Sequence, residues 1–266
     1  MNGTRQMQNT MVPVLAIMFI LLADGLACRA LSQQLHAEPS IPMGSPGPES
    51  QRLVLSSVGG QPFSSPEGTG MIDLVLKEAF GRVGIEISII IVPAERALLN
   101  VNDGIEDGNY LRISGMCDKY PELVQVPEKL VVWEFVAFSR KVDVEMKGWE
   151  NLKPYDVAII TGWKILEENV RDTRSLFKVR DQSILFNLLG RDRVDIVVYS
   201  RLGGEAMIRH LGLTGVKALE PPLASREMFL YLNRKHAGLV APVSEALSRM
   251  KEDGAYQNIV SRNAQP

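Results

Sequence analysis

Apolar positions from residue 52 onward fall into short runs whose spacing alternates between strand-like and helix-like. The runs 52–58 and 85–92 are rich in β-branched residues and predict strands. The run 85–92 is so continuously apolar that we expect this strand to be covered on both faces. Between them, residues 71–83 carry apolar side chains at three- and four-residue spacing, which predicts an amphipathic helix ending at Gly84. A second helix follows from 93 into Gly104, and then a strand with the sequence NYLRI.

The remainder of the chain continues this alternation after a further apolar strand at 130–138. We expect strands at 155–161, 194–200 and 228–234, and helices at 163–170, 183–190, 201–212 and 239–250, the last closed by Gly254. Alternating strands and helices indicate mostly parallel sheets with helices packed on them. Two such units in one chain predict an α/β protein with two lobes.

One local pattern occurs in both halves. Residues 93–112 and 183–200 each contain a helix, a glycine, a short turn, an aspartate and a strand. We interpret Asp107 and Asp195 as turn and strand-entry residues. The pattern is common in α/β proteins, so it supports paired lobes only together with other evidence.

The first thirty residues differ in character from the rest. Arg5 precedes an apolar run at 11–23, and small residues follow at a spacing suited to cleavage. A run of this length is shorter than the ~20 residues of a membrane-spanning helix, so we interpret 1–30 as a signal peptide cleaved between Cys28 and Leu31 and the protein as periplasmic. A lipid anchor on Cys28 is the alternative, although a glycine stands where the lipoprotein motif has a larger apolar residue. Residues 31–51 are rich in proline and polar residues, and we expect a flexible leader.

Composition excludes several classes of function. The chain of 266 residues is 45% hydrophobic with a net charge of −2, and it lacks a basic stripe, so we expect no nucleic-acid partner. Two cysteines exclude a disulfide scaffold. The three histidines form no metal or catalytic motif, and neither a nucleophile elbow nor a phosphate-binding loop is present. We therefore expect no cofactor, no metal and no catalytic residues.

An ordered series of features over 59–108 resembles the first lobe of periplasmic solute-binding proteins of ABC importers, of the amino-acid-binding type. The series has a Pro62–Phe63 loop, then Gly70, Asp73 and Leu74, a helix, a strand that begins with Gly-Ile, an arginine-bearing helix, and the step from glycine to aspartate. The similarity continues through "YPELVQVPEKLVVWEFVAFSR", "GRDRVDIVVYS" and "ALSRMKEDGAY". No single motif is diagnostic, and the order of the series carries the resemblance.

The resemblance implies a type 2 periplasmic-binding fold. One lobe would comprise 52–132 and 226–262 and the other 140–220, with hinge crossings at 133–139 and 221–225. It further implies capture of a small carboxylate-bearing molecule, amino-acid-like or an organic acid, by a monomer that serves an inner-membrane ABC permease. A sensory protein feeding a separate receptor, or a dehydratase on the same fold, remains an alternative.

Candidate ligand contacts lie at strand ends and on loops facing the expected cleft. They are Phe63, Arg112, Trp133, Thr161, Gly162, Trp163, Tyr199 and Ser200. Arg112 could hold a carboxylate through two parallel hydrogen bonds, and the backbone amides near Gly162 and Trp163 could assist at a helix N-terminus. Two departures from the family pattern put amino-acid specificity in doubt. No threonine stands three residues before Arg112, and Ser200 replaces the acidic residue that often holds an ammonium group.

Overall fold

The computed structural model describes residues 52–263. The signal peptide, Cys28 and the leader predicted from the sequence lie outside the described residues. The strands are β1 (Arg52–Ser57), β2 (Glu86–Ile91), β3 (Gly108–Arg112), β4 (Leu123–Gln125), β5 (Val131–Ser139), β6 (Asp156–Ile160), β7 (Ser175–Val179), β8 (Ile196–Ser200) and β9 (Lys217–Asn233). The helices are α1 (Met71–Arg82), α2 (Ala94–Asn102), α3 (Lys164–Asn169), α4 (Gln182–Gly190), α5 (Arg201–His210), α6 (Val240–Glu252) and α7 (Ala255–Asn263).

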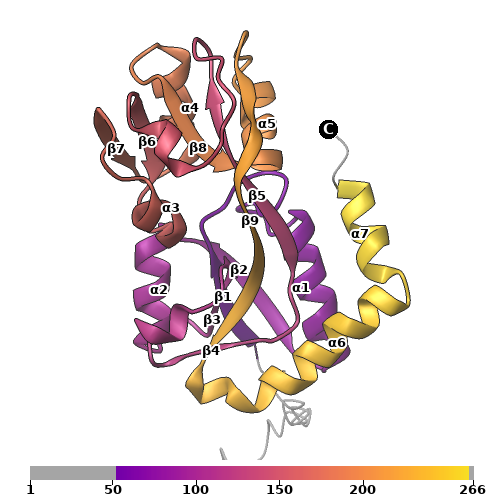
Figure 1. Ribbon diagram of the computed structural model, residues 1–266. Helices are drawn as coiled ribbons and strands as arrows, with labels where there is room; N and C mark the ends of the chain where they lie inside the picture. Colours follow the sequence, from indigo (N-terminus) through magenta and orange to yellow (C-terminus); the bar gives the residue numbers. More distant parts are fainter. Residues whose placement is uncertain (1–51, 264–266) are drawn as a thin grey trace, which may run out of the picture. The chain divides into compact units, whose positions relative to one another are not determined.

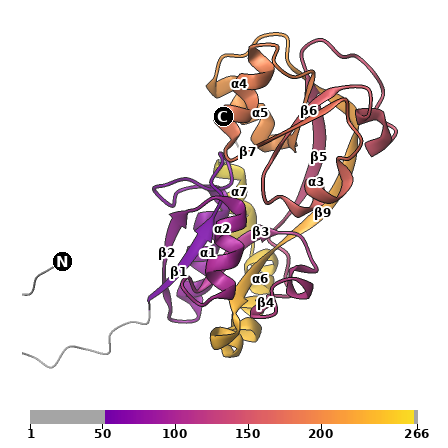
Figure 2. The ribbon, with the colours of Figure 1, turned by 90° about the vertical axis from the view of Figure 1, so that its left-hand side faces the viewer.

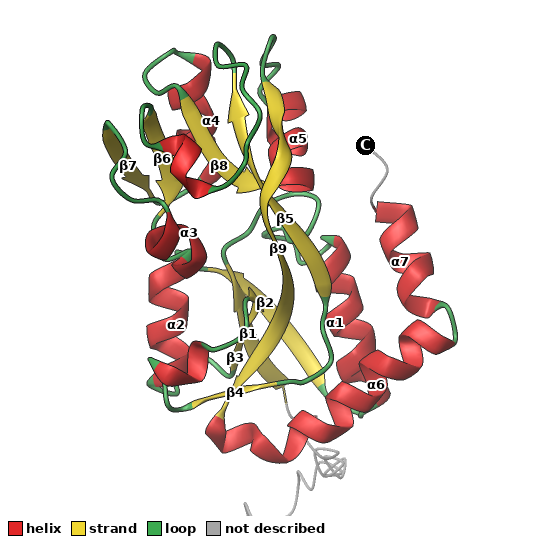
Figure 3. Cartoon of the chain, viewed as in Figure 1, coloured by secondary structure: helices red, strands yellow, loops and turns green. Residues whose placement is uncertain are grey.

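The strands pair in the order β2-β1-β3-β9-β5-β8-β6-β7, with β4 added beside β9. The three strands β2, β1 and β3 are parallel to one another, and so are β7, β6 and β8. Each parallel group carries its own helices, as Figures 1 and 3 show. We call the part with β1 to β4 the first lobe and the part with β6 to β8 the second lobe. The predicted two-lobed α/β class is confirmed.

Helices cover both sides of the first lobe's strands. Helix α1 packs with α6 and α7 on one side, and α2 lies on the other (Figure 1). The apolar face predicted for α1 is buried within the helix, and Val83 after its end is half-buried. The first turn of the helix has half of a capping box, because the Asp73 carboxylate accepts a hydrogen bond from the Gly70 amide at 3.0 Å. In the part of the chain that the structure describes, no helix has the length and apolar character needed to cross a membrane.

Strands β5 and β9 run through both lobes as an antiparallel pair, which Figures 1 and 2 show from two sides. Val131 pairs with Met228 at one end and Ser139 with Lys217 at the other. The register shifts between Phe135 and Ala137, where β9 carries extra residues. The sequence predicted a strand only from residue 228, because Pro221 and Pro222 lack the backbone N–H donors of a regular strand ladder.

The repeated pattern around Asp107 and Asp195 has the same structural role in each lobe. The Asp107 amide donates to the Val54 carbonyl at 2.9 Å, and its carboxylate accepts from the Val54 amide at 2.8 Å. Asp195 makes the same pair of contacts with Asp156, at 2.9 and 3.1 Å. Each aspartate therefore begins a strand and joins it to its parallel neighbour, which confirms the interpretation as strand-entry residues.

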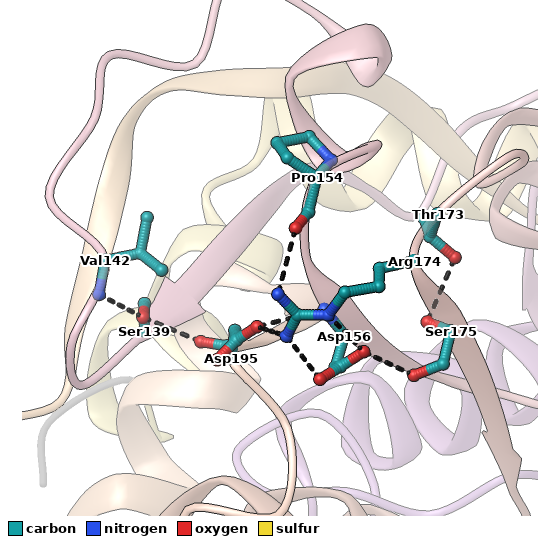
Figure 4. Close-up of polar contacts among 8 residues, drawn as sticks. All are labelled: Ser139, Val142, Pro154, Asp156, Thr173, Arg174, Ser175 and Asp195. Atoms are coloured by element: carbon teal, nitrogen blue, oxygen red, sulfur yellow. Dashed lines mark hydrogen bonds and ion pairs between the residues drawn. The ribbon is translucent and has the colours of Figure 1, made fainter.

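Each of these carboxylates also has basic partners. Asp107 contacts Lys235 at 2.9 Å and His236 at 2.7 Å. Asp195 contacts Arg174 at 2.5 Å, and the same guanidinium binds Asp156, as Figure 4 shows. In both lobes the basic groups stabilise a carboxylate at the entry to the parallel strand that lies next to the crossing strands, β3 beside β9 and β8 beside β5.

Three expectations from the sequence differ from the structure. Strand β2 is not covered on both faces, since Ile90 and Ile91 are 37% and 39% exposed. It pairs only with β1 and lies at the edge of the sheet. Strands β4 and β7 were not predicted, because both are short and carry little apolar alternation. Helix α7 was not predicted as a separate helix after Gly254.

Candidate ligand-binding site

Arg112 lies at the end of β3 after an irregular step in the strand. Leu111 has a left-handed φ of 60°, and the pairing with β9 shifts between Tyr110 and Arg112. A bulge of this kind re-aims the next side chain. The Arg112 guanidinium consequently reaches the same side as Asn109, whose side-chain oxygen accepts a hydrogen bond from Nε. Strain of this type at a β-branched or bulky position is most frequent at functional sites.

The Arg112 side chain is buried without a carboxylate partner. It is 5% exposed, and its Nη2 donates to the Ala94 carbonyl at 2.7 Å. Within residues 52–263, no Asp or Glu oxygen lies within 4.0 Å of it. Burial lowers the pKa of Arg112 to about 10, although electrostatic interactions with Tyr120 and Glu95 oppose this shift. A guanidinium has five N–H donors, and the hydrogen bonds to Asn109 and Ala94 use two of them.

Aromatic rings form a continuous row from the first lobe to the second. Phe63 lies 4.9 Å from Trp133 of β5, measured between ring centroids, and Trp133 lies 5.3 Å from Trp163. Trp163 in turn stacks on Tyr199 at 4.6 Å. These separations are within the range in which aromatic pairs stabilise each other. The row joins the loop after β1, the crossing strand β5 and the second lobe.

A small cavity of about 20 Å³ lies between Arg112 and this row. Arg112, Trp133, Gly162, Trp163 and Lys164 are among the residues that line it, together with apolar side chains. A cavity of this volume can hold about one water molecule. A larger guest therefore requires the lobes or the indole rings to move.

Contacts between the lobes close this region. Gly162, with φ of 83°, lies against the backbone of α2, so close that an added Cβ atom would be 2.5 Å from the Glu95 nitrogen. Lys164 of α3 forms an ion pair with Glu95 and another with Glu167 at 3.2 Å. Lys119 and Glu168 form a further ion pair across the lobes at 3.3 Å.

The hydrogen bonds of Lys164 affect its charge and that of its neighbour. Burial opposes the Lys164 charge, but the bonds to Glu95 and Glu167 outweigh it and raise the Lys164 pKa. Burial likewise opposes the charge on Glu167, and the Gly162 amide together with Lys164 lowers its pKa. Lys164 and Glu167 therefore stay charged at neutral pH, and the ion pair of Lys164 with Glu95 favours the closed arrangement.

Comparison with solved structures places these features in a known architecture. The ligand-binding core of GluR0 in complex with L-glutamate superimposes with a TM-score of 0.71 at 12% identity, covering 80% of this chain and 98% of that chain. An ancestral arginine-binding protein bound to arginine gives 0.67 at 20% identity, covering 79% and 97%. A histidine kinase sensor domain with similarity to periplasmic binding proteins gives 0.70 at 16% identity, covering 79% and 95%.

This chain has the type 2 periplasmic-binding fold. The likeness spans almost the full length of each of these structures. In sequence, the chain is 25% identical over 194 residues to an uncharacterized protein of Shewanella oneidensis, which covers 70% of this chain and 72% of that protein. No protein-family model matches the chain.

The remaining predicted residues take different places in the periplasmic-binding fold. Phe63 does not line the cavity but packs on Trp133, which does. Thr161 lines a separate surface groove together with Arg96. Tyr199 is buried and donates to Gln182 at 2.5 Å. Ser200 is buried before α5, and its Oγ has no hydrogen-bond partner within residues 52–263.

The amides expected to help bind an anion already have acceptors. The Gly162 amide donates to the Glu167 carboxylate at 2.9 Å, and the Trp163 amide donates to the Ile160 carbonyl at 3.3 Å. The expectation of free amides at this helix start is therefore wrong for this conformation. Helix α3 has six residues, and its own Glu167 satisfies the donor that a ligand would have used.

Other residues of the site could not be found from the sequence. Lys164 was read only as part of a helix, and Met116 and Met228 had no assigned role, yet all three line the cavity. The positive φ of Leu111 has no sequence signal at all, since leucine rarely adopts it.

Proposed function

We propose that the protein is a solute-binding protein that captures a small carboxylate-bearing molecule between its lobes. Arg112 holds the carboxylate, and the aromatic row with the apolar cavity wall covers the rest of the ligand. Closure follows from contacts that the ligand makes with both lobes, so the ligand stabilises the closed state by its differential affinity for that state.

The observation that carries this proposal is the buried charge of Arg112 beside the cavity, which has no carboxylate partner among residues 52–263. An isolated buried cation is costly, and natural proteins pair such charges. A ligand carboxylate would provide the partner, with two parallel hydrogen bonds to the free donors of the guanidinium. The strained bulge at Leu111 supports the same assignment, because it re-aims the arginine.

In this proposal the protein is exported to the periplasm through the segment 1–30, acts as a monomer and delivers its ligand to an inner-membrane ABC permease. It binds without turnover. Two of the similar structures support ligand binding on this fold, since they hold bound arginine and L-glutamate. The sequence of 11–23 supports export.

A thermal-shift screen of organic acids, amino acids and amines tests the proposal. A ligand at ~100 times its dissociation constant adds ~2.7 kcal/mol to the free energy of unfolding, which raises the melting temperature measurably. A screen in which no carboxylate shifts the melting temperature would contradict the proposed function.

Substitution of Arg112 tests the site itself. Removing one partner of a buried charge pair costs ~2 to 5 kcal/mol, so Arg112→Ala should weaken binding of a carboxylate hit at least tenfold. Arg112→Lys should restore little, because an ammonium lacks the planar fork. Arg171→Ala is the matched control, since Arg171 is exposed in the second lobe away from the cavity. Calorimetry that finds wild-type affinity in Arg112→Ala would show that the arginine is only structural.

A sensory role is the second candidate, because a histidine kinase sensor domain shares the fold over 79% of this chain. Here the closed lobes would bind a separate receptor rather than a permease. Uptake of the radiolabelled ligand by cells with and without the gene separates the two functions. Loss of uptake supports import, and normal uptake with a lost transcriptional response supports sensing.

A further inference from the structure

We propose that the ligand is a small organic monoanion without a cationic group: a carboxylate with an apolar body, and not an α-amino acid. The inference rests on the proposed function and names the chemical class of its ligand. It follows from the polar side chains that line the cavity, all of which are hydrogen-bond donors.

Arg112, Lys164, Trp133 and Trp163 are the polar side chains among the described residues lining the cavity. A guanidinium, an ammonium and an indole donate hydrogen bonds and accept none. The side chains that complete the wall are apolar, and no carboxylate, amide or hydroxyl group lies among those of the described residues. A ligand that enters this cavity therefore meets donors and apolar surface.

The indole of Trp133 gives independent evidence for an acceptor in the ligand. Its side chain is 4% exposed, and within residues 52–263 Nε1 has no hydrogen-bond partner. A buried donor without a partner is unfavourable, and such groups are rare in folded proteins. A ligand oxygen that reaches both Arg112 and Trp133 would satisfy this donor at the same time as the guanidinium.

Carboxylates that could hold an ammonium group are already engaged. Glu95 and Glu167 both pair with Lys164. The buried carboxylate of Asp73 accepts from the Ser65 amide at 2.9 Å and from the Tyr110 hydroxyl at 2.5 Å. An α-ammonium group in the cavity would have to give up its water without gaining a side-chain acceptor, which is strongly unfavourable.

The apolar side chains that line the cavity indicate the chemical character of the rest of the ligand. Leu111, Ile113, Met116, Phe135, Ile165 and Met228 line the cavity. A ligand body with hydroxyl groups would leave them unpaired against these side chains, whereas a hydrocarbon body gains from burial.

Pairs of ligands with the same carbon skeleton test the inference on the full-length protein. The probes are propanoate and L-alanine, 3-methylbutanoate and L-valine, 4-methylpentanoate and L-leucine, and 3-phenylpropanoate and L-phenylalanine. Calorimetry gives the affinities. Intrinsic fluorescence gives a second readout, because two of the three tryptophans, Trp133 and Trp163, line the cavity. We expect at least one acid to bind at least tenfold more tightly than its amino acid.

The outcomes separate the inference from the proposed function. An amino acid that binds as tightly as its matched acid, or more tightly, overturns the inference and leaves capture of a carboxylate intact. If neither member of any pair binds, and the wider screen also finds no carboxylate, the proposed function fails and the inference with it.

A conservative substitution tests the role of the indole. Trp133→Phe keeps an aromatic ring in the row and removes the N–H donor, so the affinity for the acid should fall at least threefold. Trp149→Phe is the control, because Trp149 lies in the turn Trp149–Leu152, outside the cavity. Circular dichroism and the ligand-free melting temperature check that both variants fold. Unchanged affinity in Trp133→Phe would overturn the assignment of this donor to the ligand.

Discussion

Replacing Gly162 by alanine should prevent full closure of the lobes without disturbing either lobe alone. An alanine Cβ atom would lie 2.5 Å from the Glu95 nitrogen and 3.0 Å from the Ala94 carbonyl carbon, both on the other lobe. Real Cβ atoms essentially never approach another heavy atom within 3.0 Å. Because both neighbours are backbone atoms of a helix start, the clash is relieved only if the loop and α2 move apart.

The expected loss of ligand affinity in Gly162→Ala follows from the contacts between the lobes that this movement weakens. Separation of the lobes loosens the ion pair of Lys164 with Glu95, which is partly exposed and worth up to about 1 kcal/mol. It also loosens packing around Trp163 in the aromatic row. A total of about 1.4 to 3 kcal/mol corresponds to a ten- to hundredfold decrease in ligand affinity, since the apparent dissociation constant rises as the closed fraction falls.

Gly254→Ala is the matched control for backbone strain. Gly254 has φ of 82° against 83° for Gly162, and no atom lies within 4 Å of its hypothetical Cβ. A non-glycine residue in this region costs ~1 to 2 kcal/mol, so both variants should lose a similar amount of folding stability to backbone strain. Only Gly162→Ala should bind the screened carboxylate more weakly and show a larger radius of gyration by small-angle X-ray scattering. Equal affinities in the two variants would refute the reasoning.

Three further predictions concern stability and export. Asp107→Asn should lower the free energy of unfolding by ~1 to 3 kcal/mol at pH 7. Burial opposes the Asp107 charge, but the Val54 amide and two basic side chains outweigh it and lower the pKa from 3.8. The stabilisation is therefore complete above pH ~4 and lost as pH falls further, so the difference in urea unfolding between wild type and variant should shrink as the pH is lowered below ~4. Asp73→Ala should cost about 3 kcal/mol in thermal unfolding, because it leaves buried donors unpaired, and a loss below 1 kcal/mol would contradict this. N-terminal sequencing of periplasmic material should find a start between Cys28 and Leu31, and an intact Met1 would refute export by cleavage.

The spacing of apolar residues and the positions of glycine and aspartate along the chain predicted much of the fold. Apolar side chains at helical spacing in 71–83 predicted α1 because one continuous stripe must be buried, and the structure buries it. The repeated step from glycine to Asp107 and to Asp195 predicted strand entry, because aspartate accepts backbone hydrogen bonds in turns. Gly104 has the left-handed φ expected after a helix, whereas in the second lobe Gly190 is the last residue of α4 and Asp192 has the positive φ. The edge position of β2 was missed, since apolar content does not reveal which strands are neighbours.

The sequence also placed Arg112 and the aromatic residues in the candidate site, because strand ends and the loops that follow them face the cleft in such folds. Tertiary structure decided what these residues can do. The bulge at Leu111 aims Arg112 at the Ala94 carbonyl, and the described part of the chain offers this arginine no carboxylate. Glu167 accepts the hydrogen bond of the Gly162 amide that the sequence had assigned to an anion. Periodicity records which side chains must be buried, whereas the partners of a buried polar group depend on segments distant in the chain. Those contacts exist only once the two lobes have folded and met.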